Sequence, residues 1–181
     1  FQLLISLLLL VSGLSAQGFS YEEGLQNCDS ARQELNKQIE ATGQWMGLKA
    51  ECLTGANLPD FTATTMDGKT IDRNYFLGKV TLINFWMKTC KPCISEIPGL
   101  SKLKDEFGTE KVNFLAIGRC NEEDAKAFLA KYPWNFDHIN NGLPLIEDVF
   151  RFGWGYPVMM LVNKKGQKVL AFNGGVVGEK R

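Results

Sequence analysis

The chain has 181 residues, of which 45% are hydrophobic, which is enough for one domain with a buried core and too few for a second full domain. Its 20 Lys and Arg residues are balanced by 20 Asp and Glu residues. Because neither charge is in surplus, the composition argues against a nucleic-acid-binding protein and indicates no strongly charged partner.

The first segment, residues 1–18, carries no charge, and its apolar run gives way to small residues. This pattern predicts a signal peptide cleaved near Ala16 or Gly18, and an uncleaved membrane anchor is the alternative. The run starts at Phe1 without preceding basic residues, so we expect the natural protein to begin further upstream. Either interpretation places the remainder in an oxidising compartment, where disulfides persist.

Residues 19–54 are expected to form an N-terminal helical extension, consisting of one helix with flanking turns. Ser30 and Gln33 have the S-x-x-Q spacing of a capping box. Leu35 and Ile39 then repeat at the four-residue spacing of one helix face.

From residue 55 the pattern changes to short strands and helices. "FTATTMDGKTI" alternates around Asp67-Gly68 and predicts a β-hairpin, and "DRNYFLG" predicts a helical turn that ends at Gly78. The apolar runs "KVTLINFWM" and "VNFLAIG" are typical of strands buried on both faces.

Helices are expected between and after these strands. The first spans residues 90–107 with a kink at Pro98, and its apolar stripe consists of Ile94, Ile97, Leu100, Leu103 and Phe107. "NEEDAKAFLAKY" predicts a second helix capped by Asn121, and "LPLIEDVFRFG" predicts one or two further helical turns. A hairpin turning at Lys165-Gly166 follows. This order predicts an α/β fold, a central mixed β-sheet with helices on both faces.

Two cysteines, Cys90 and Cys93, lie three residues apart in "WMKTCKPCISEIP". A zinc site normally needs a second ligand pair, but Cys28, Cys52 and Cys120 make no further C-x-x-C and the single histidine is distant in sequence. Haem attachment requires a histidine directly after the second cysteine, where this chain has an isoleucine. We therefore expect no metal and no cofactor other than a redox-active disulfide.

The position of Cys90 favours redox chemistry over a structural staple, because a loop this short removes little chain entropy. A helix N-terminus offers unpaired N–H groups and a positive dipole end, which stabilise a thiolate. Lys88 and Lys91 could favour that thiolate further, with ordinary solvated surface lysines as the alternative, and Pro92 suits the first helical turn. Cys93, one turn along, is placed to attack a mixed disulfide at Cys90.

Four segments in order carry a resemblance to a known family: "LPDFTATTMDGKTI", "GKVTLINFWMKTCKPC", "EIP" and "GYPVMMLVNKKGQKV". Between Gly55 and Gly175 the sequence resembles the thioredoxin superfamily, specifically its extracytoplasmic TlpA/ResA-like branch. The resemblance implies a thioredoxin-like three-layer fold over residues 55–181, with the closing C-terminal helix largely missing from the sequence.

The resemblance also implies roles for individual residues. Cys90 would be the nucleophile, Cys93 the resolving cysteine, and Tyr156-Pro157 a cis peptide bond opposite them. Glu96 matches an acidic residue characteristic of this branch and would relay the Cys93 proton, whereas without the resemblance it reads as an ordinary surface glutamate. The residues implied to contact a substrate are Trp86, Thr89, Lys91, Pro92, Tyr156 and Pro157. Thr89, Tyr156 and Val158 depart from the side chains that many relatives carry.

The implied function is an extracytoplasmic thiol-disulfide oxidoreductase of the bacterial periplasm that exchanges disulfides with protein substrates. The resemblance favours a reductant that is itself reduced by a membrane-embedded thiol protein. One alternative is a peroxiredoxin-like thiol peroxidase, although neither Cys90 nor Cys93 fits the P-x-x-x-T/S-x-x-C pattern of that family. The other is a non-catalytic thioredoxin-like adaptor, which the intact cysteine pair disfavours.

Cys28 and Cys52 are interpreted as a structural disulfide that ties the N-terminal extension to the domain, with two unpaired thiols as the alternative. A loop of this length would contribute about 3 kcal/mol in the chain-entropy model. Cys120, at the end of a predicted strand, is expected to be an unpaired, partly buried cysteine.

Overall fold

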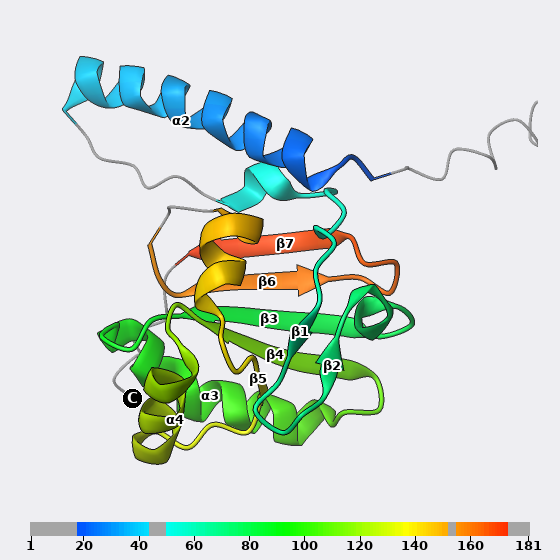
Figure 1. Cartoon of the computed structure of the whole chain (residues 1–181). Coiled ribbons are helices and arrows are strands. Elements are labelled where there is room, and N and C mark those ends of the chain that lie inside the picture. Colours follow the sequence, from blue (N-terminus) through cyan, green and yellow to red (C-terminus); the bar gives the residue numbers. More distant parts are fainter. Residues whose placement is uncertain (1–17, 44–49, 152–154, 174–181) are drawn as a thin grey trace, which may run out of the picture.

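The structure, a computed structural model, describes residues 18–43, 50–151 and 155–173 (Figure 1). The expected signal peptide lies outside these residues except for Gly18, and so does the C-terminal segment 174–181. None of the helices in the described ranges is both long and apolar enough to cross a lipid bilayer.

A five-stranded mixed sheet forms the centre of the fold, in the strand order β5-β4-β3-β6-β7. Its strands are β3 (Val80–Trp86), β4 (Val112–Gly118), β5 (Asp137–His138), β6 (Val158–Val162) and β7 (Lys168–Asn173). The neighbours of β3 are β4, which is parallel, and β6, which is antiparallel. This arrangement confirms the predicted mixed sheet with "VTLINFW" as its central strand.

Two hydrophobic clusters lie on the two faces of the sheet. Alternate residues of β3 enter each of them: Ile83 and Phe85 join one cluster, and Leu82 and Trp86 join the other. The helices α3 (Lys91–Phe107) and α4 (Glu122–Lys131) pack on the Leu82 side. The helical turn η3 (Leu145–Phe150), wound as a π-helix, packs on the other side (Figure 1). The sheet is therefore the middle of three layers.

The smaller elements also follow the predictions. β1 (Ala63–Thr64) and β2 (Thr70–Ile71) pair antiparallel around the predicted turn, where Gly68 has a φ of 85°. The short helix η2 (Arg73–Phe76) follows them, and Asn121 caps α4 as expected. The prediction that Phe107 belongs to the apolar stripe of α3 was wrong. Phe107 is the last residue of α3, is 57% exposed and does not continue the buried stripe.

The N-terminal helix α2 (Tyr21–Thr42) starts earlier than the capping-box spacing suggested. Ser20 is the N-cap and forms the box with Glu23, whereas Ser30 lies inside the helix and donates to the carbonyl of Gln26. The prediction of a box at Ser30 and Gln33 was therefore wrong. The physical reason is that contacts of Tyr21 with the domain anchor the first turn of the helix.

Two connections hold α2 on the domain. The Tyr21 hydroxyl donates to the carbonyl of Phe150 over 3.0 Å, and Cys28 is joined to Cys52 by a disulfide. Cys52 belongs to the short helix η1 (Ala50–Leu53), which packs against β7. Figure 1 shows α2 across the β7 edge of the sheet. Its second half is exposed apart from the half-buried Leu35 and Ile39.

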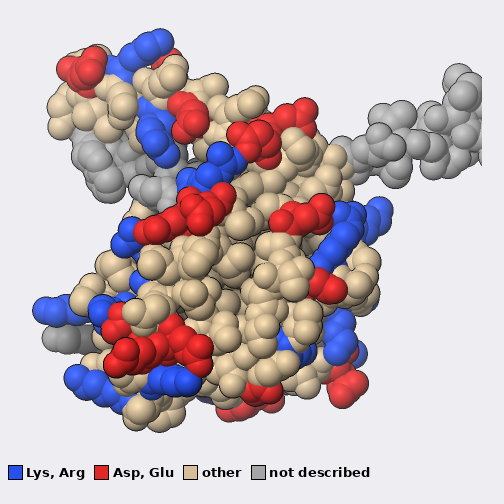
Figure 2. All heavy atoms as spheres, viewed as in Figure 1, with Lys and Arg blue, Asp and Glu red and all other residues tan. Residues whose placement is uncertain are grey.

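The surface carries mixed charge. Figure 2 shows acidic and basic side chains interspersed over one face of the molecule, which agrees with the balanced composition. Several of them form exposed ion pairs, such as Arg119 with Glu147 and Lys88 with Asp124.

Candidate redox site

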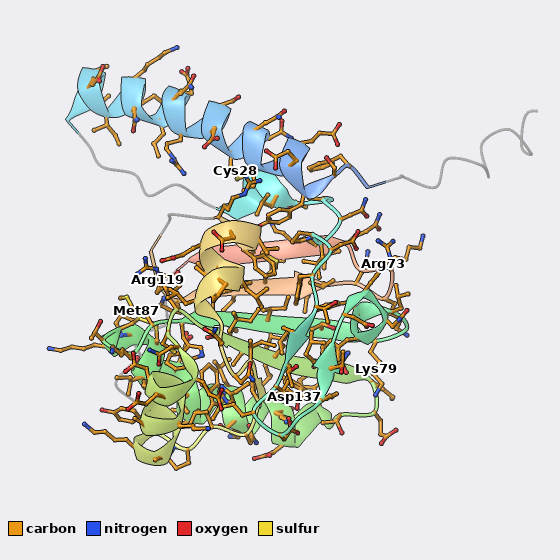
Figure 3. The ribbon with its side chains drawn as sticks, viewed as in Figure 1. Cys28, Arg73, Lys79, Met87, Arg119 and Asp137 are labelled. Carbon is orange, nitrogen blue, oxygen red and sulfur yellow. A yellow bond between two sulfur atoms is a disulfide. The ribbon has the colours of Figure 1, made fainter. Side chains whose placement is uncertain are left out.

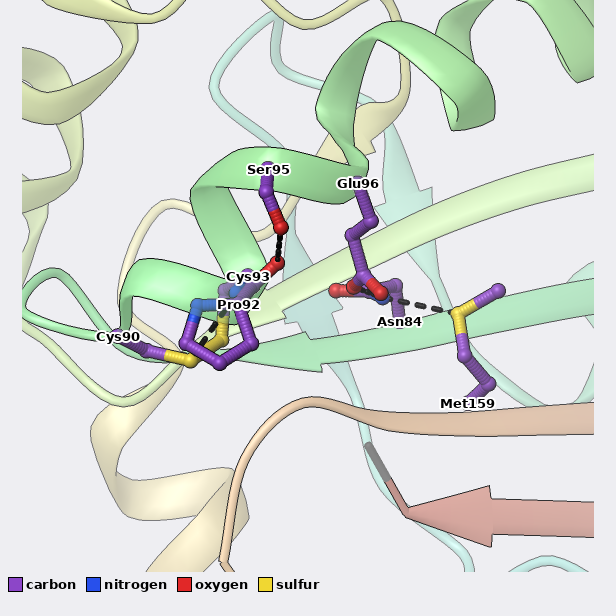
Figure 4. Close-up of a disulfide and its surroundings, with 7 residues drawn as sticks. All are labelled: Asn84, Cys90, Pro92, Cys93, Ser95, Glu96 and Met159. Atoms are coloured by element: carbon purple, nitrogen blue, oxygen red, sulfur yellow. Dashed lines mark hydrogen bonds between the residues drawn. A yellow bond between two sulfur atoms is a disulfide. The ribbon is translucent and has the colours of Figure 1, made fainter. Parts of the chain in front are cut away.

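The C-x-x-C pair lies where the central strand β3 ends and α3 begins. Cys90 is the N-cap of α3, and its sulfur forms a 2.05 Å bond with that of Cys93 (Figure 4). Pro92 occupies the first turn of the helix, where its missing N–H costs no intrahelical hydrogen bond. Met87 and Arg119 lie at this end of the sheet, and Arg73 and Lys79 lie at the other (Figure 3).

The two sulfur atoms are not equivalent. The backbone N–H of Cys93 donates to Cys90 Sγ over 3.2 Å, as the helix N-terminus predicts. Cys90 is 6% exposed and Cys93 is 1% exposed, and the neighbours Thr89, Lys91 and Pro92 are exposed. Cys90 is therefore slightly more exposed than Cys93, and its neighbours in sequence are at the surface.

The two flanking lysines have different environments. Lys88 is paired with Asp124 of α4, with Nζ and Oδ2 2.8 Å apart, and this hydrogen bond raises the pKa of Lys88. Its charge is shared with a carboxylate and is therefore not free to act on Cys90 alone. Lys91 is exposed beside Cys90.

Glu96 lies one helical turn after Cys93 and is half-buried. Asn84 Nδ2 of β3 donates to Glu96 Oε1 over 2.7 Å (Figure 4). Burial raises the pKa of Glu96, and the Asn84 hydrogen bond opposes that rise. Glu96 is therefore not a fully exposed side chain of the helix surface.

Asn84 is a site residue that the sequence interpretation missed. It is fully buried in the middle of β3 and contacts the sulfur of Met159 in β6 as well as Glu96. The available signal was a single amide inside the otherwise apolar run "LINFW".

Trp86 does not lie at a surface that a substrate could contact, which corrects the expectation for this residue. It is 1% exposed and stacks on Phe128 of α4, with ring centroids 4.2 Å apart. A Cβ at Gly118 would approach its ring to 2.6 Å, so a glycine is required there. Trp86 packs in the same hydrophobic cluster as both cysteines and thus supports the site from behind.

The Tyr156-Pro157 peptide bond is cis. Tyr156 is half-buried and packs against the cluster that contains Cys90 and Cys93, whereas Pro157 is buried. Burial raises the pKa of Tyr156. Val158 begins β6 and is fully buried, so of these three residues Tyr156 offers the accessible side chain.

The remaining cysteines have separate environments. Cys28 and Cys52 form the disulfide that joins α2 to η1. Cys120 is free and 4% exposed, and burial raises the pKa of its thiol to about 11. No group of three His, Cys, Asp or Glu side chains in the described residues has the arrangement of a metal site.

Comparisons with known proteins agree with this geometry. The family model for the AhpC/TSA family matches residues 54–167. The thioredoxin-like protein YneN of Bacillus subtilis is 30% identical over 118 residues, which are 62% of this chain and 66% of YneN. The thiol-disulfide oxidoreductase ResA of Bacillus cereus is 30% identical over 123 residues, which are 67% of this chain and 70% of ResA.

A solved structure shows the same fold. The thioredoxin domain of a thiol-disulfide oxidoreductase from Bacteroides vulgatus superimposes with a TM-score of 0.59 at 25% identity. The superposition covers 67% of this chain and 89% of that domain.

Proposed function

The chain belongs to the AhpC/TSA family and is a thioredoxin-like thiol-disulfide oxidoreductase, and from this premise we propose that it acts outside the cytoplasm as a reductant of protein disulfides through Cys90 and Cys93. The observation that carries the proposal is the Cys90–Cys93 disulfide at the start of α3, with the Cys93 N–H directed at Cys90 Sγ. An N–H donor at a helix N-terminus favours a thiolate, and Cys90, which accepts it, is the more exposed of the two residues.

The proposed reaction has two exchange steps. In the reduced protein, the Cys90 thiolate attacks a substrate disulfide, forms a mixed disulfide and releases one substrate thiolate. Cys93 then loses its proton and attacks Cys90 Sγ, which forms the Cys90–Cys93 disulfide and releases the second substrate thiolate. Two electrons pass from the protein to the substrate.

Glu96 is the proposed acceptor of the Cys93 proton. Residues three apart on a helix are neighbours, so the carboxyl group and the thiol share one side of α3. A carboxylate whose pKa is raised by burial is a stronger base than an exposed one. Its position therefore supports a role in the second step, when Cys93 must become a thiolate.

The substrate is proposed to contact the residues around Cys90. Thr89, Lys91 and Pro92 flank this cysteine in sequence and are exposed, and Tyr156 packs against the hydrophobic cluster that contains it. Pro157 joins the proposed contact through its backbone, because its side chain is buried. A protein segment carrying a disulfide is the substrate class that fits a redox cysteine flanked by exposed residues on its own chain.

The location and the partner belong to the same proposal. The Cys28–Cys52 disulfide supports an oxidising compartment, such as the bacterial periplasm, since structural disulfides persist there. A reductant in such a compartment requires a source of electrons. We assign that role to a membrane-embedded thiol protein that reduces the Cys90–Cys93 disulfide after each turnover.

Reduction of insulin disulfides and turnover of hydrogen peroxide, measured side by side, test the activity. We expect insulin reduction that Cys90→Ser abolishes, with no peroxide consumption, and Cys120→Ala as a control that retains activity. Peroxide turnover without insulin reduction would indicate a peroxidase, and neither activity would indicate an adaptor. Equilibration with a glutathione buffer tests the direction: we expect a potential nearer about −270 mV than about −120 mV.

A further inference from the structure

The position of Asn84 in the sheet does not explain why the residue there is an asparagine. Its side chain lies on the α3 face of β3, where the flanking residues on the same face are Leu82 and Trp86. It is 0% exposed, and asparagine is disfavoured in a buried strand. A leucine would fill this place without burying an amide, so the amide calls for a chemical reason.

The nitrogen and the oxygen of the Asn84 side-chain amide differ in their hydrogen bonding. Nδ2 donates to Glu96 Oε1 over 2.7 Å and lies 2.9 Å from Met159 Sδ, as Figure 4 shows. Oδ1 is buried and has no hydrogen-bond partner among the described residues. An ionised carboxylate offers only acceptors, so Glu96 cannot satisfy this oxygen while it is charged.

Protonation of Glu96 removes this mismatch. A carboxylic acid has one O–H donor and retains an acceptor oxygen, and a primary amide presents the complementary acceptor and donor. The same Asn84 side chain can therefore hold the carboxylate through Nδ2–H and the acid through both Nδ2–H and Oδ1. The carboxyl group stays in place while a proton arrives and leaves.

We propose that Asn84 is a positioning residue for proton transfer from Cys93 to Glu96, holding the carboxyl group of Glu96 in both of its protonation states. The inference rests on the proposed relay role of Glu96. Asn84 of β3 donates to the Glu96 carboxyl group, Met159 of β6 contacts the same amide, and Cys93 precedes Glu96 by one turn of α3. Among the described residues, no charged side chain contributes to the pKa of Glu96, so its pH response reports on burial and on Asn84.

One experiment measures the reaction of Cys90 and the reaction of Cys93 as two separate phases. Reduced protein in a Cys120→Ala background is mixed with dithiobis-nitrobenzoate, which releases one coloured thiolate when Cys90 attacks it. A second thiolate is released when Cys93 resolves the mixed disulfide. The rate of each phase is followed across pH in the parent protein, Asn84→Leu, Glu96→Gln and the double variant.

We expect the first phase to be unchanged in Asn84→Leu. The rate of the second phase should fall at low pH as Glu96 becomes protonated, and we call this fall the acid limb. In Asn84→Leu the acid limb should move to higher pH by about one unit, because the Glu96 carboxylate has lost its hydrogen-bond donor and ionises less readily. In Glu96→Gln the second phase should be slow and lack that limb. Adding Asn84→Leu to Glu96→Gln should then change nothing further, since coupled residues are not additive.

Asn113→Leu is the matched control, because it removes another side-chain amide of the sheet that donates to Tyr75 and Thr81. It should leave both phases unchanged. If Asn84→Leu does not fold, Asn84→Asp replaces it, and the acid limb should then move further because two carboxyl groups compete for ionisation.

A parental pH profile in Asn84→Leu would overturn the inference, and so would an equal effect of this substitution in the Glu96→Gln background. An unchanged second phase in Glu96→Gln would overturn both the relay and the role of Asn84. The oxidoreductase activity is judged separately, by the first phase and by insulin reduction, so its failure is distinguishable.

Discussion

At the residue scale, the helix start assigns different environments to two cysteines that look equivalent in the motif. Cys90 occupies the N-cap and accepts the N–H of Cys93, whereas Cys93 lies in the first turn with its side chain against the core. The difference in exposure is small in the oxidised state, 6% against 1%, so the helix N-terminus must account for most of any difference in reactivity.

The first prediction concerns the order of attack. Cys93→Ser should accumulate a mixed disulfide between Cys90 and a substrate, because the resolving thiol is missing. Cys90→Ser should accumulate at least about tenfold less, because the helix N-terminus and the Cys93 N–H favour a thiolate at Cys90 and not at Cys93. Non-reducing electrophoresis after incubation with a disulfide-containing protein measures both. Trapping by Cys90→Ser alone would reverse the assignment.

Cys120 shows the opposite effect of burial on a thiol. Burial and, to a smaller extent, the nearby Asp124 carboxylate raise the pKa of Cys120, Lys88 opposes them, and the resulting pKa is about 11. At neutral pH this side chain is therefore a protonated thiol, which is a poor nucleophile.

The second prediction follows from this environment. Iodoacetamide at pH 7 should alkylate Cys120 at least about tenfold more slowly in the folded, reduced protein than in denaturant, since only a small thiolate fraction exists. Peptide mass mapping over time gives both rates, with Cys90 as the fast internal control. Equal rates with and without denaturant would contradict the buried position.

At the element scale, α2 depends on the domain for its stability. It is polar for most of its length, and its buried residues Tyr21, Gly24 and Cys28 all lie within its first eight residues. Few isolated helices of this kind are stable in water, so the contacts at its N-terminal end and the disulfide keep it folded.

The third prediction tests this attachment. The Cys28→Ser and Cys52→Ser double variant lacks the disulfide between two cysteines that are 24 residues apart in sequence. Its free energy of unfolding should be lower by about 3 kcal/mol. Thermal unfolding followed by circular dichroism measures the loss, and Cys120→Ser serves as a cysteine substitution outside the link. Insulin reduction should persist in the folded double variant, because the redox site lies on α3. A melting temperature equal to that of the parent would show that the disulfide adds nothing to stability.

At the scale of the whole molecule, the core contains one titratable imidazole. His138 is 7% exposed at the end of β5, and its Nε2 lies 3.2 Å from the carbonyl oxygen of Trp134. The rings of Trp134 and Trp86 pack around it, with centroids 5.0 Å and 6.5 Å away. Burial lowers the pKa of His138 from 6.5 to about 4.

The fourth prediction is the resulting pH dependence of stability. Between pH 6.5 and about 4 the unfolded chain binds a proton at His138 and the folded protein does not, so stability falls as pH falls through this window. The full loss is about 3 kcal/mol. Glu96 contributes to the pH dependence of stability with the opposite sign, because its raised pKa makes the folded state bind a proton more strongly than the unfolded state.

Denaturant unfolding at several pH values measures this dependence, and His138→Phe is the control. Because His138 is the single histidine of the chain, the variant should lose most of the fall in stability between pH 6.5 and 4. An equally steep fall in the variant would assign the pH dependence to carboxyl groups instead.

The sequence by itself determined the elements of the domain and the redox pair. Apolar runs such as "VTLINFW", the Asp67-Gly68 turn and the Asn121 cap act through neighbouring residues, so their local chemistry can be interpreted without a fold. The C-x-x-C pair at a helix start is local in the same sense. These predictions were confirmed as secondary structure, while the catalytic roles of the cysteines stay predictions.

The tertiary structure decided which side chains share a space. Trp86 and Phe107 were misplaced because burial depends on which element covers a residue, and the α2 cap moved to Ser20 because Tyr21 contacts η3. Asn84 and Glu96 are twelve residues apart and meet only when β3 and α3 pack together. Spacing along a chain does not encode such a contact, because it arises from packing between elements that fold back on each other.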